Sequence, residues 1–133
     1  MIVIKFGGSS VSNSKNIERV LNIIKSKNNP CVVVVSAVGG VTNLLNESSV
    51  LAEKGKKSYL NKVDLVEKKH LIIIKKLLSG SIKESAINDM NKLVSKLKKI
   101  LEGVFMIGER SIQTKDSILN FGELLSCLLY TSP

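Results

Sequence analysis

Residues 2–10 read IVIKFGGSS and residues 31–40 read CVVVVSAVGG. Each stretch is a short apolar run closed by two glycines, which is typical of a buried strand followed by a turn. Apolar residues between positions 17 and 24 recur at three- and four-residue spacing, which predicts an amphipathic helix. This order predicts a right-handed βαβ unit with parallel strands over residues 2–6 and 31–37. Because the second run does not alternate apolar and polar residues, we expect that strand to be covered on both faces.

The rest of the chain carries apolar residues at helical spacing, which predicts four further helices. They are expected from about Val41 to Gly55, from Tyr59 to Leu77, from Ser81 to Gly103, and from near Thr114 onward. Ser81 and Glu84 have the S-x-x-E spacing of a capping box, which predicts the start of the third of these helices. Because two strands leave a parallel sheet without further neighbours, the chain is expected to be an incomplete domain.

The length of 133 residues suits one domain, and we assign residues 1–126 to it. Residues 127–133 read CLLYTSP and resemble translated sequencing-adapter sequence. We therefore predict that they form a non-native tail without a role in function. No apolar run reaches the roughly 18 to 20 residues of a membrane span, and the start lacks the features of a signal peptide. The sequence thus predicts a soluble cytoplasmic protein without a membrane partner.

The charge balance is strongly basic, since 20 Lys and Arg against 11 Asp and Glu give 20 − 11 = +9. Nucleic-acid binding is nevertheless disfavoured, because only two of the 20 cations are Arg and the five aromatic residues are scattered along the chain. The two cysteines, Cys31 and Cys127, lie far apart, so neither a disulfide framework nor a metal cluster is predicted.

The first candidate site is the segment KFGGSS at residues 5–10, directly after the first predicted strand. Glycine lets backbone N–H groups approach an oxyanion closely, and the loop leads into the start of a helix. Lys5 adds a full positive charge, and Ser9 and Ser10 add hydroxyl donors, so phosphate oxygens are the expected ligand. The spacing matches neither Walker A nor G-x-G-x-x-G, and a plain glycine turn with a surface lysine remains the alternative.

The second candidate site is the segment SAVGGVTN at residues 36–43, at the carboxyl end of the second predicted strand. In a parallel βαβ unit both glycine loops lie at one edge of the sheet, where open α/β folds bind ligands. We therefore expect a cleft between the two loops, with Lys5 beside it. Thr42 has an alternative interpretation as the cap of the following helix.

The single histidine, His70, lies on an apolar helical face, and we interpret it as a core residue. No Ser-His-Asp or Cys-His set is present to favour hydrolase chemistry. Phosphoryl transfer to a carboxylate needs no strong base, because a carboxylate is already ionised at neutral pH. It needs positioning and cations, which Lys5 and the glycine loops could supply. Glu123 follows Gly122 on a helix, where it is either solvated or paired with a cation.

Three ordered segments resemble the amino-terminal catalytic region of aspartokinases, within the amino-acid kinase family. They are KFGGSSV at 5–11, VVVVSAVGGVTNLL at 32–45 and GERSIQTKDSILNFGELLS at 108–126. The stretch around the third segment is most similar to the kinase half of bifunctional aspartokinase/homoserine dehydrogenases. The resemblance implies an α/β fold, a three-layer α/β/α sandwich of the carbamate kinase-like type, of which this chain would be the amino-terminal portion.

The resemblance also implies an enzyme that uses ATP, with Mg2+, to phosphorylate the side-chain carboxylate of L-aspartate to 4-phospho-L-aspartate. This is the first step toward lysine, threonine and methionine, and the parent enzyme is expected to be a homo-oligomer. Lys5 would steady the transferring phosphoryl group, and Thr42 and Glu123 would hold the aspartate. The phosphates of ATP would lie among Lys5, Gly7, Gly8, Ser9 and Ser10, and no metal-ligating residue is assigned.

Two positions depart from the usual pattern of the family, which has Thr at the position of Ser9 and Arg at the position of Leu124. The later substrate loops, the adenine pocket and the regulatory domains of the family have no counterpart in this sequence, so the chain alone is expected to be inactive. The alternatives are another member of the family, such as a glutamate or nucleoside-monophosphate kinase, and a non-catalytic basic binding module.

Overall fold

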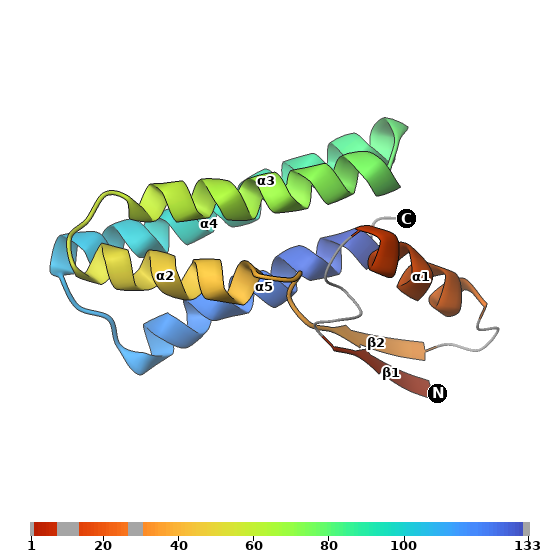
Figure 1. The fold of residues 1–133 in the computed structure, drawn as a ribbon, viewed down its shortest axis with the longest axis horizontal. Helices are drawn as coiled ribbons and strands as arrows, with labels where there is room; N and C mark the ends of the chain where they lie inside the picture. Colours follow the sequence, from red (N-terminus) through yellow and green to blue (C-terminus); the bar gives the residue numbers. More distant parts are fainter. Residues whose placement is uncertain (1, 8–13, 27–30, 132–133) are drawn as a thin grey trace.

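The computed structural model describes residues 2–7, 14–26 and 31–131 (Figure 1). Strands β1 (Ile2–Phe6) and β2 (Cys31–Val35) form a parallel two-stranded sheet, with Ile2 opposite Cys31 and Phe6 opposite Val35. Helix α1 (Ser14–Lys25) connects the two strands. The predicted strand–helix–strand unit is therefore confirmed, although β2 ends two residues before Ala37. The amide of Ser36 still donates to the carbonyl of Phe6 at 3.2 Å, after which the chain turns away from the sheet.

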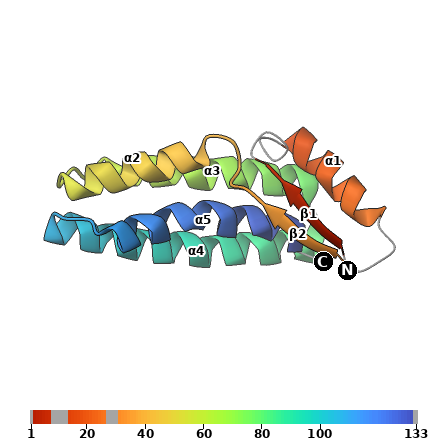
Figure 2. The same ribbon diagram turned by 90° about the horizontal axis from the view of Figure 1, so that it is seen from below.

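Four helices follow the sheet and pack lengthwise beside one another (Figures 1 and 2). They are α2 (Val41–Glu53), α3 (Tyr59–Leu77), α4 (Gly80–Ile107) and α5 (Ile112–Thr131). Each helix buries one stripe of apolar residues against its neighbours. Among the most buried are residues that are at most 1% exposed, namely Leu45, Ile74, Leu97, Leu101 and Ile118. The sheet and α1 lie at one end of this bundle, and α5 reaches β2.

Two of the predicted boundaries of α4 are wrong. The helix begins at Gly80, one residue before Ser81, and Ser79 precedes it in an extended conformation without a side-chain cap hydrogen bond. Ser81 and Glu84 therefore form no capping box. The helix also continues through Gly103, because an isolated glycine within a strongly apolar pattern weakens a helix without ending it. It ends at Gly108, whose φ of 80° is the left-handed conformation that glycine adopts at a helix C-terminus.

The last helix has the side-chain cap that α4 lacks. The amide of Thr114 donates to the hydroxyl oxygen of Ser111 at 3.0 Å, and this satisfies one of the first N–H groups of α5. The helix therefore begins at Ile112, two residues before the predicted start near Thr114. It continues to Thr131, and Leu129 is buried in the core. No helix among the described residues is both long and apolar enough to cross a membrane.

Among the described residues, helices cover only one face of the sheet, contrary to the prediction that β2 is covered on both faces. Phe6, Val33 and Val35 pack toward the core, and α1 and α5 lie on this side of the strands (Figures 1 and 2). On the opposite face, Val3, Val32 and Val34 are 68%, 44% and 46% exposed. The valine run is therefore suited to burial on both sides, but no helix of the described part covers the second face.

Candidate functional site

The carboxyl ends of β1 and β2 lie side by side, because the strands are parallel and Phe6 pairs with Val35. Gly7 and the segment from Ser36 to Gly40 therefore leave the sheet at the same edge. This confirms the predicted common edge of the two glycine segments, as far as Gly7. Gly8, Ser9 and Ser10, the other predicted phosphate-binding residues, lie outside the described residues, and their assignment stays a prediction.

Lys5 lies one residue before the end of β1, opposite Val34. Its position in the strand is on the open face of the sheet together with Val3, and its side chain is exposed. The ammonium group is thus accessible from solvent near the edge where both glycine segments leave the sheet. No ion pair of Lys5 lies within the described residues, so its exposed ammonium group can meet an incoming anion there.

The second glycine segment forms a tight corner that starts α2. Gly40 has a φ of 83° and occupies the N-cap position without a side-chain hydrogen bond. The amide of Val41 donates to the carbonyl of Val38 at 3.0 Å, and the amide of Leu44 donates to the carbonyl of Gly40 at 3.2 Å. Thr42 is already inside the helix and exposed, so the alternative interpretation of Thr42 as the helix cap is wrong. Its hydroxyl lies on the surface beside the positive end of the helix dipole.

Helix α5 contacts this corner at Gly122. A Cβ atom at Gly122 would lie 2.8 Å from Cβ of Ala37, 3.4 Å from Leu45 Cδ1 and 3.6 Å from Val41 Cγ1. Only glycine allows the two backbones to approach so closely. Glu123 is the next residue in α5 and is exposed, and its role in holding the substrate stays a prediction. Because its carboxylate is solvated, the fold does not require a cationic partner for it.

The structure adds a second lysine that the sequence analysis missed. Lys69 on α3 donates from Nζ to the carbonyl oxygen of Gly39 at 3.2 Å. The same Nζ lies 3.5 Å from the position that a Cβ of Gly40 would occupy. Lys69 is one of five lysines on α3 and matches no motif, so no sequence signal distinguished it. Only the packing of α3 against α2 brings it to the glycine corner.

His70 follows Lys69 and is 1% exposed, as predicted for a core residue. Its Nδ1 lies 2.7 Å from the carbonyl oxygen of Val66, which assigns the ring proton to Nδ1. No partner for Nε2 lies among the described residues. Burial lowers the pKa of His70 below its usual 6.5, and the charge of Lys69 lowers it further, whereas the hydrogen bond to Val66 opposes the shift. The imidazole is therefore neutral at pH 7 and serves packing.

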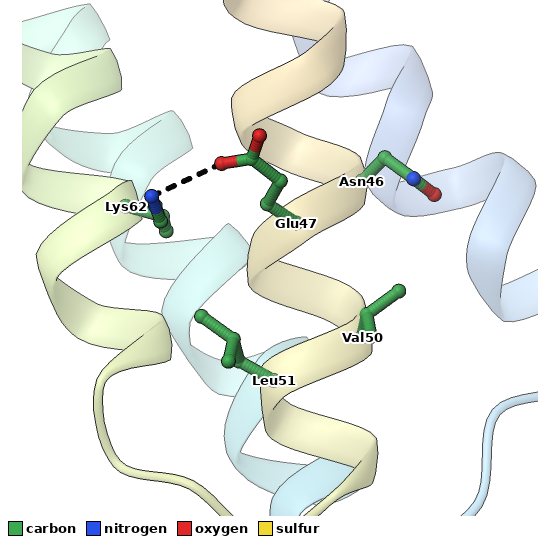
Figure 3. Close-up of a pocket in the computed structure, with 5 residues that line it drawn as sticks. All are labelled: Asn46, Glu47, Val50, Leu51 and Lys62. Atoms are coloured by element: carbon green, nitrogen blue, oxygen red, sulfur yellow. Dashed lines mark ion pairs between the residues drawn. The ribbon is translucent and has the colours of Figure 1, made fainter.

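A shallow hollow lies beside α2 and is lined by Asn46, Glu47, Val50, Leu51 and Lys62 (Figure 3). Lys62 on α3 forms an ion pair with Glu47 at 3.1 Å across its rim. No predicted site residue lines this hollow, and an exposed ion pair of this kind stabilises little. The sheet edge therefore remains the candidate site. Within the described ranges, no group of three His, Cys, Asp or Glu side chains has the arrangement of a metal site.

Comparison with known proteins identifies the family. A profile described as the Amino acid kinase family matches residues 1–132. The chain belongs to the amino acid kinase family. Its fold class is thereby the predicted α/β type, of which the described residues form a small parallel sheet and a large helical part.

Several members of the family with sequences similar to this chain are aspartokinases. The chain is 36% identical to the aspartokinase of Candida albicans over 140 residues, which cover 98% of the chain and 25% of that protein. It is 33% identical to the chloroplastic bifunctional aspartokinase/homoserine dehydrogenase 2 of Arabidopsis thaliana over 123 residues, covering 92% of the chain and 13% of the relative. The chain thus spans a quarter or less of the length of these two relatives.

The structure is also similar to solved aspartokinases. E. coli aspartokinase III in complex with aspartate and ADP superimposes with a TM-score of 0.81 and 28% identity, over 99% of this chain and 28% of that one. The complex of the same enzyme with lysine and aspartate gives a TM-score of 0.82 and 26% identity, with the same coverage. The fold of this chain is therefore that of the corresponding part of a longer kinase chain.

Proposed function

We propose that this chain is the amino-terminal part of an aspartokinase, which transfers the γ-phosphoryl group of ATP to the side-chain carboxylate of L-aspartate. The observation that carries the proposal is the contact of Gly122 with Ala37, because it places the FGE segment of α5 against the corner that begins α2. Two of the three segments that resemble aspartokinases thereby meet at the edge of the sheet where β1 ends at Phe6. The relatives and the solved structures described above support the same activity.

The reaction suits the groups at this edge. An oxygen of the ionised aspartate carboxylate attacks the γ-phosphorus, the bond from that phosphorus to the β,γ-bridging oxygen breaks, and ADP leaves with the electron pair. No proton needs to be removed from the nucleophile, which agrees with the lack of an exposed histidine among the described residues. The catalytic demand is therefore for positive charge and alignment.

Each residue has one role in this proposal. The exposed ammonium of Lys5 neutralises charge on the transferring phosphoryl group, and Gly7, Gly8, Ser9 and Ser10 surround the ATP phosphates. Thr42 donates a hydrogen bond from its hydroxyl group to the substrate. The carboxylate of Glu123 accepts hydrogen bonds from the ammonium group of aspartate. Mg2+ bound with ATP would supply further neutralisation of the phosphates, and we assign no residue of this chain as its ligand.

The extent of the functional unit is part of the proposal. Residues 1–126 would be the amino-terminal piece of the catalytic domain, and residues 127–133 a non-native tail, although α5 is continuous into that segment. The chain by itself would be inactive, because the remainder of the nucleotide and substrate sites would come from further sequence. We also infer a homo-oligomeric parent enzyme in the cytoplasm, which size-exclusion chromatography and cell fractionation of the complete gene product would test.

The activity is tested with the complete gene product and a panel of acceptors. Acyl phosphates are trapped with hydroxylamine, and aspartate, glutamate and nucleoside monophosphates are compared at equal concentration, with ADP release measured in parallel. We expect hydroxamate with aspartate and little with glutamate. Product with another acceptor but not with aspartate would show a different member of the family. Binding to DNA with a steep salt dependence and no ADP release would favour a basic binding module.

A further inference from the structure

We propose that Lys69 is a positioning residue for the acceptor substrate, acting through the Gly39–Gly40 corner. The inference rests on the proposed function and deepens it, because it assigns a role at the same site to a residue on a different helix. It starts from one hydrogen bond of the Lys69 ammonium group and from the closeness of that side chain to Gly40. Nζ of Lys69 donates to the carbonyl oxygen of Gly39 at 3.2 Å, and Nζ and Cε lie 3.5 and 3.7 Å from the Cβ position of Gly40.

The position of Lys69 is fixed by the core beneath it. His70 and Val66 on the same helix are buried, and α3 packs along α2. The backbone of Lys69 therefore cannot shift relative to the start of α2 without disturbing this packing. The side chain is long and exposed, but the buried residues beside it hold the base of that side chain at the level of the corner.

Holding the carbonyl of Gly39 also sets the direction of the next amide. In a planar trans peptide the C=O of one residue and the N–H of the next point in opposite directions. Because Lys69 draws the oxygen of Gly39 toward α3, the N–H of Gly40 is directed away from α3. Gly40 has a φ of 83° and no side chain, so its neighbours must determine which way this peptide faces.

The ammonium also brings charge to the corner. Thr42 lies two residues after Gly40, and Glu123 directly follows Gly122, the residue of α5 that faces Ala37 and Val41. A cation at Gly39 favours the approach of a carboxylate-bearing acceptor to a surface that already carries the Glu123 carboxylate. The effect is expected on acceptor binding and not on the phosphates, because β1 and the segment after it carry the groups assigned to ATP.

The kinetic experiment uses the complete gene product and three variants. Lys69→Met removes the charge and the hydrogen bond, Lys69→Arg retains both, and Lys68→Met removes the neighbouring exposed lysine as a matched control. We expect Lys69→Met to raise the aspartate KM about three- to tenfold, as for loss of one solvent-exposed hydrogen bond, with kcat and the ATP KM within about twofold. Lys69→Arg and Lys68→Met should stay within about twofold of the parent enzyme.

A second measurement does not depend on activity. Amide hydrogen exchange over the peptide 39–44 should be faster in Lys69→Met than in the parent, since the corner loses its contact with α3, and unchanged in Lys68→Met. The proposal is overturned if either the acceptor KM or the exchange at the corner is unchanged in Lys69→Met, or if Lys69→Arg behaves like Lys69→Met. It is also overturned if kcat and thermal stability fall together without a selective effect on acceptor KM, since this marks a structural role alone.

The outcomes of the kinetic and exchange experiments distinguish failure of the proposed function from failure of the role of Lys69. If the parent enzyme phosphorylates aspartate but the Lys69→Met variant matches it, the function stands and the positioning role fails. If the parent enzyme uses another acceptor, the assignment of aspartate fails, and the KM of that acceptor replaces the aspartate KM as the test of Lys69. If no acceptor is phosphorylated, the exchange experiment alone decides whether Lys69 orders the corner.

Discussion

The helical bundle buries its apolar residues far more completely than the strand–helix–strand unit does. Leu45, Leu97 and Leu101 in the bundle are fully buried, whereas Val32 and Val34 of the sheet remain 44% and 46% exposed. Four helices can cover one another's apolar stripes, but a two-stranded sheet has two faces and only one layer of helices beside it. The stability of the described part therefore resides mainly in the bundle. The candidate site lies where the sheet meets the bundle.

The largest expected effect tests whether the sheet end carries the chemistry. In the complete gene product, Lys5→Ala should lower kcat by about 10²–10³-fold and raise the aspartate KM much less, because the charge is needed mainly in the transition state. Glu123→Ala should show the opposite pattern, with a raised aspartate KM and a smaller effect on kcat. Steady-state kinetics with both substrates measures the two patterns. If they are exchanged, the two residue roles are assigned the wrong way round.

The stability of the bundle can be compared directly with that of the sheet. Leu97→Ala should lower the free energy of unfolding by about 2–5 kcal/mol, because it leaves a cavity at a fully buried position. Val32→Ala on the open face should cost less than about 1 kcal/mol. Denaturant unfolding followed by circular dichroism measures both variants. Equal losses would mean that the open sheet face is covered in solution.

The contact between the two regions can be probed with two glycines. Gly122→Ala should destabilise the chain by about 1–3 kcal/mol, because the new Cβ would lie 2.8 Å from Cβ of Ala37, which is attached directly to the backbone and cannot rotate away. Gly103→Ala is the matched control in α4, where no described atom lies within 4 Å of the new Cβ apart from its chain neighbours and the nearby backbone of its own helix. It should stabilise the helix by about 0.5–1 kcal/mol. If Gly122→Ala and Gly103→Ala changed the free energy of unfolding in the same direction, the close contact at Gly122 would be contradicted.

The smallest expected effect concerns pH. Burial lowers the pKa of His70 in the folded chain. Below pH 6.5 a larger fraction of His70 is therefore protonated in the unfolded chain than in the folded chain. The contribution of neutral His70 is complete above pH 6.5 and is lost progressively as the pH falls below it. His70→Leu should remove this part of the pH dependence. The difference between the two unfolding profiles isolates it from the carboxylates, and parallel profiles would show that His70 is solvated.

Periodicity in the sequence predicted the elements well and their ends less well. The apolar spacing identified both strands and all five helices of the described residues, because the burial of one stripe or face follows from the local order of apolar residues. The start of α4 and its passage through Gly103 were wrong, since S-x-x-E spacing does not ensure a cap and one glycine does not overcome the packing of a long apolar stripe. Ser111 supplies a side-chain cap that the sequence did not distinguish from other serines.

The sequence by itself determined that two glycine segments follow parallel strands and therefore share an edge, and it picked out Lys5, Thr42 and Glu123 through their motifs. Tertiary structure alone decided that Gly122 brings α5 against the start of α2, that Lys69 reaches the carbonyl of Gly39, and that one face of the sheet stays open. The physical reason is that periodicity reports which face of an element is buried. It does not report which other element, distant in the sequence, covers that face.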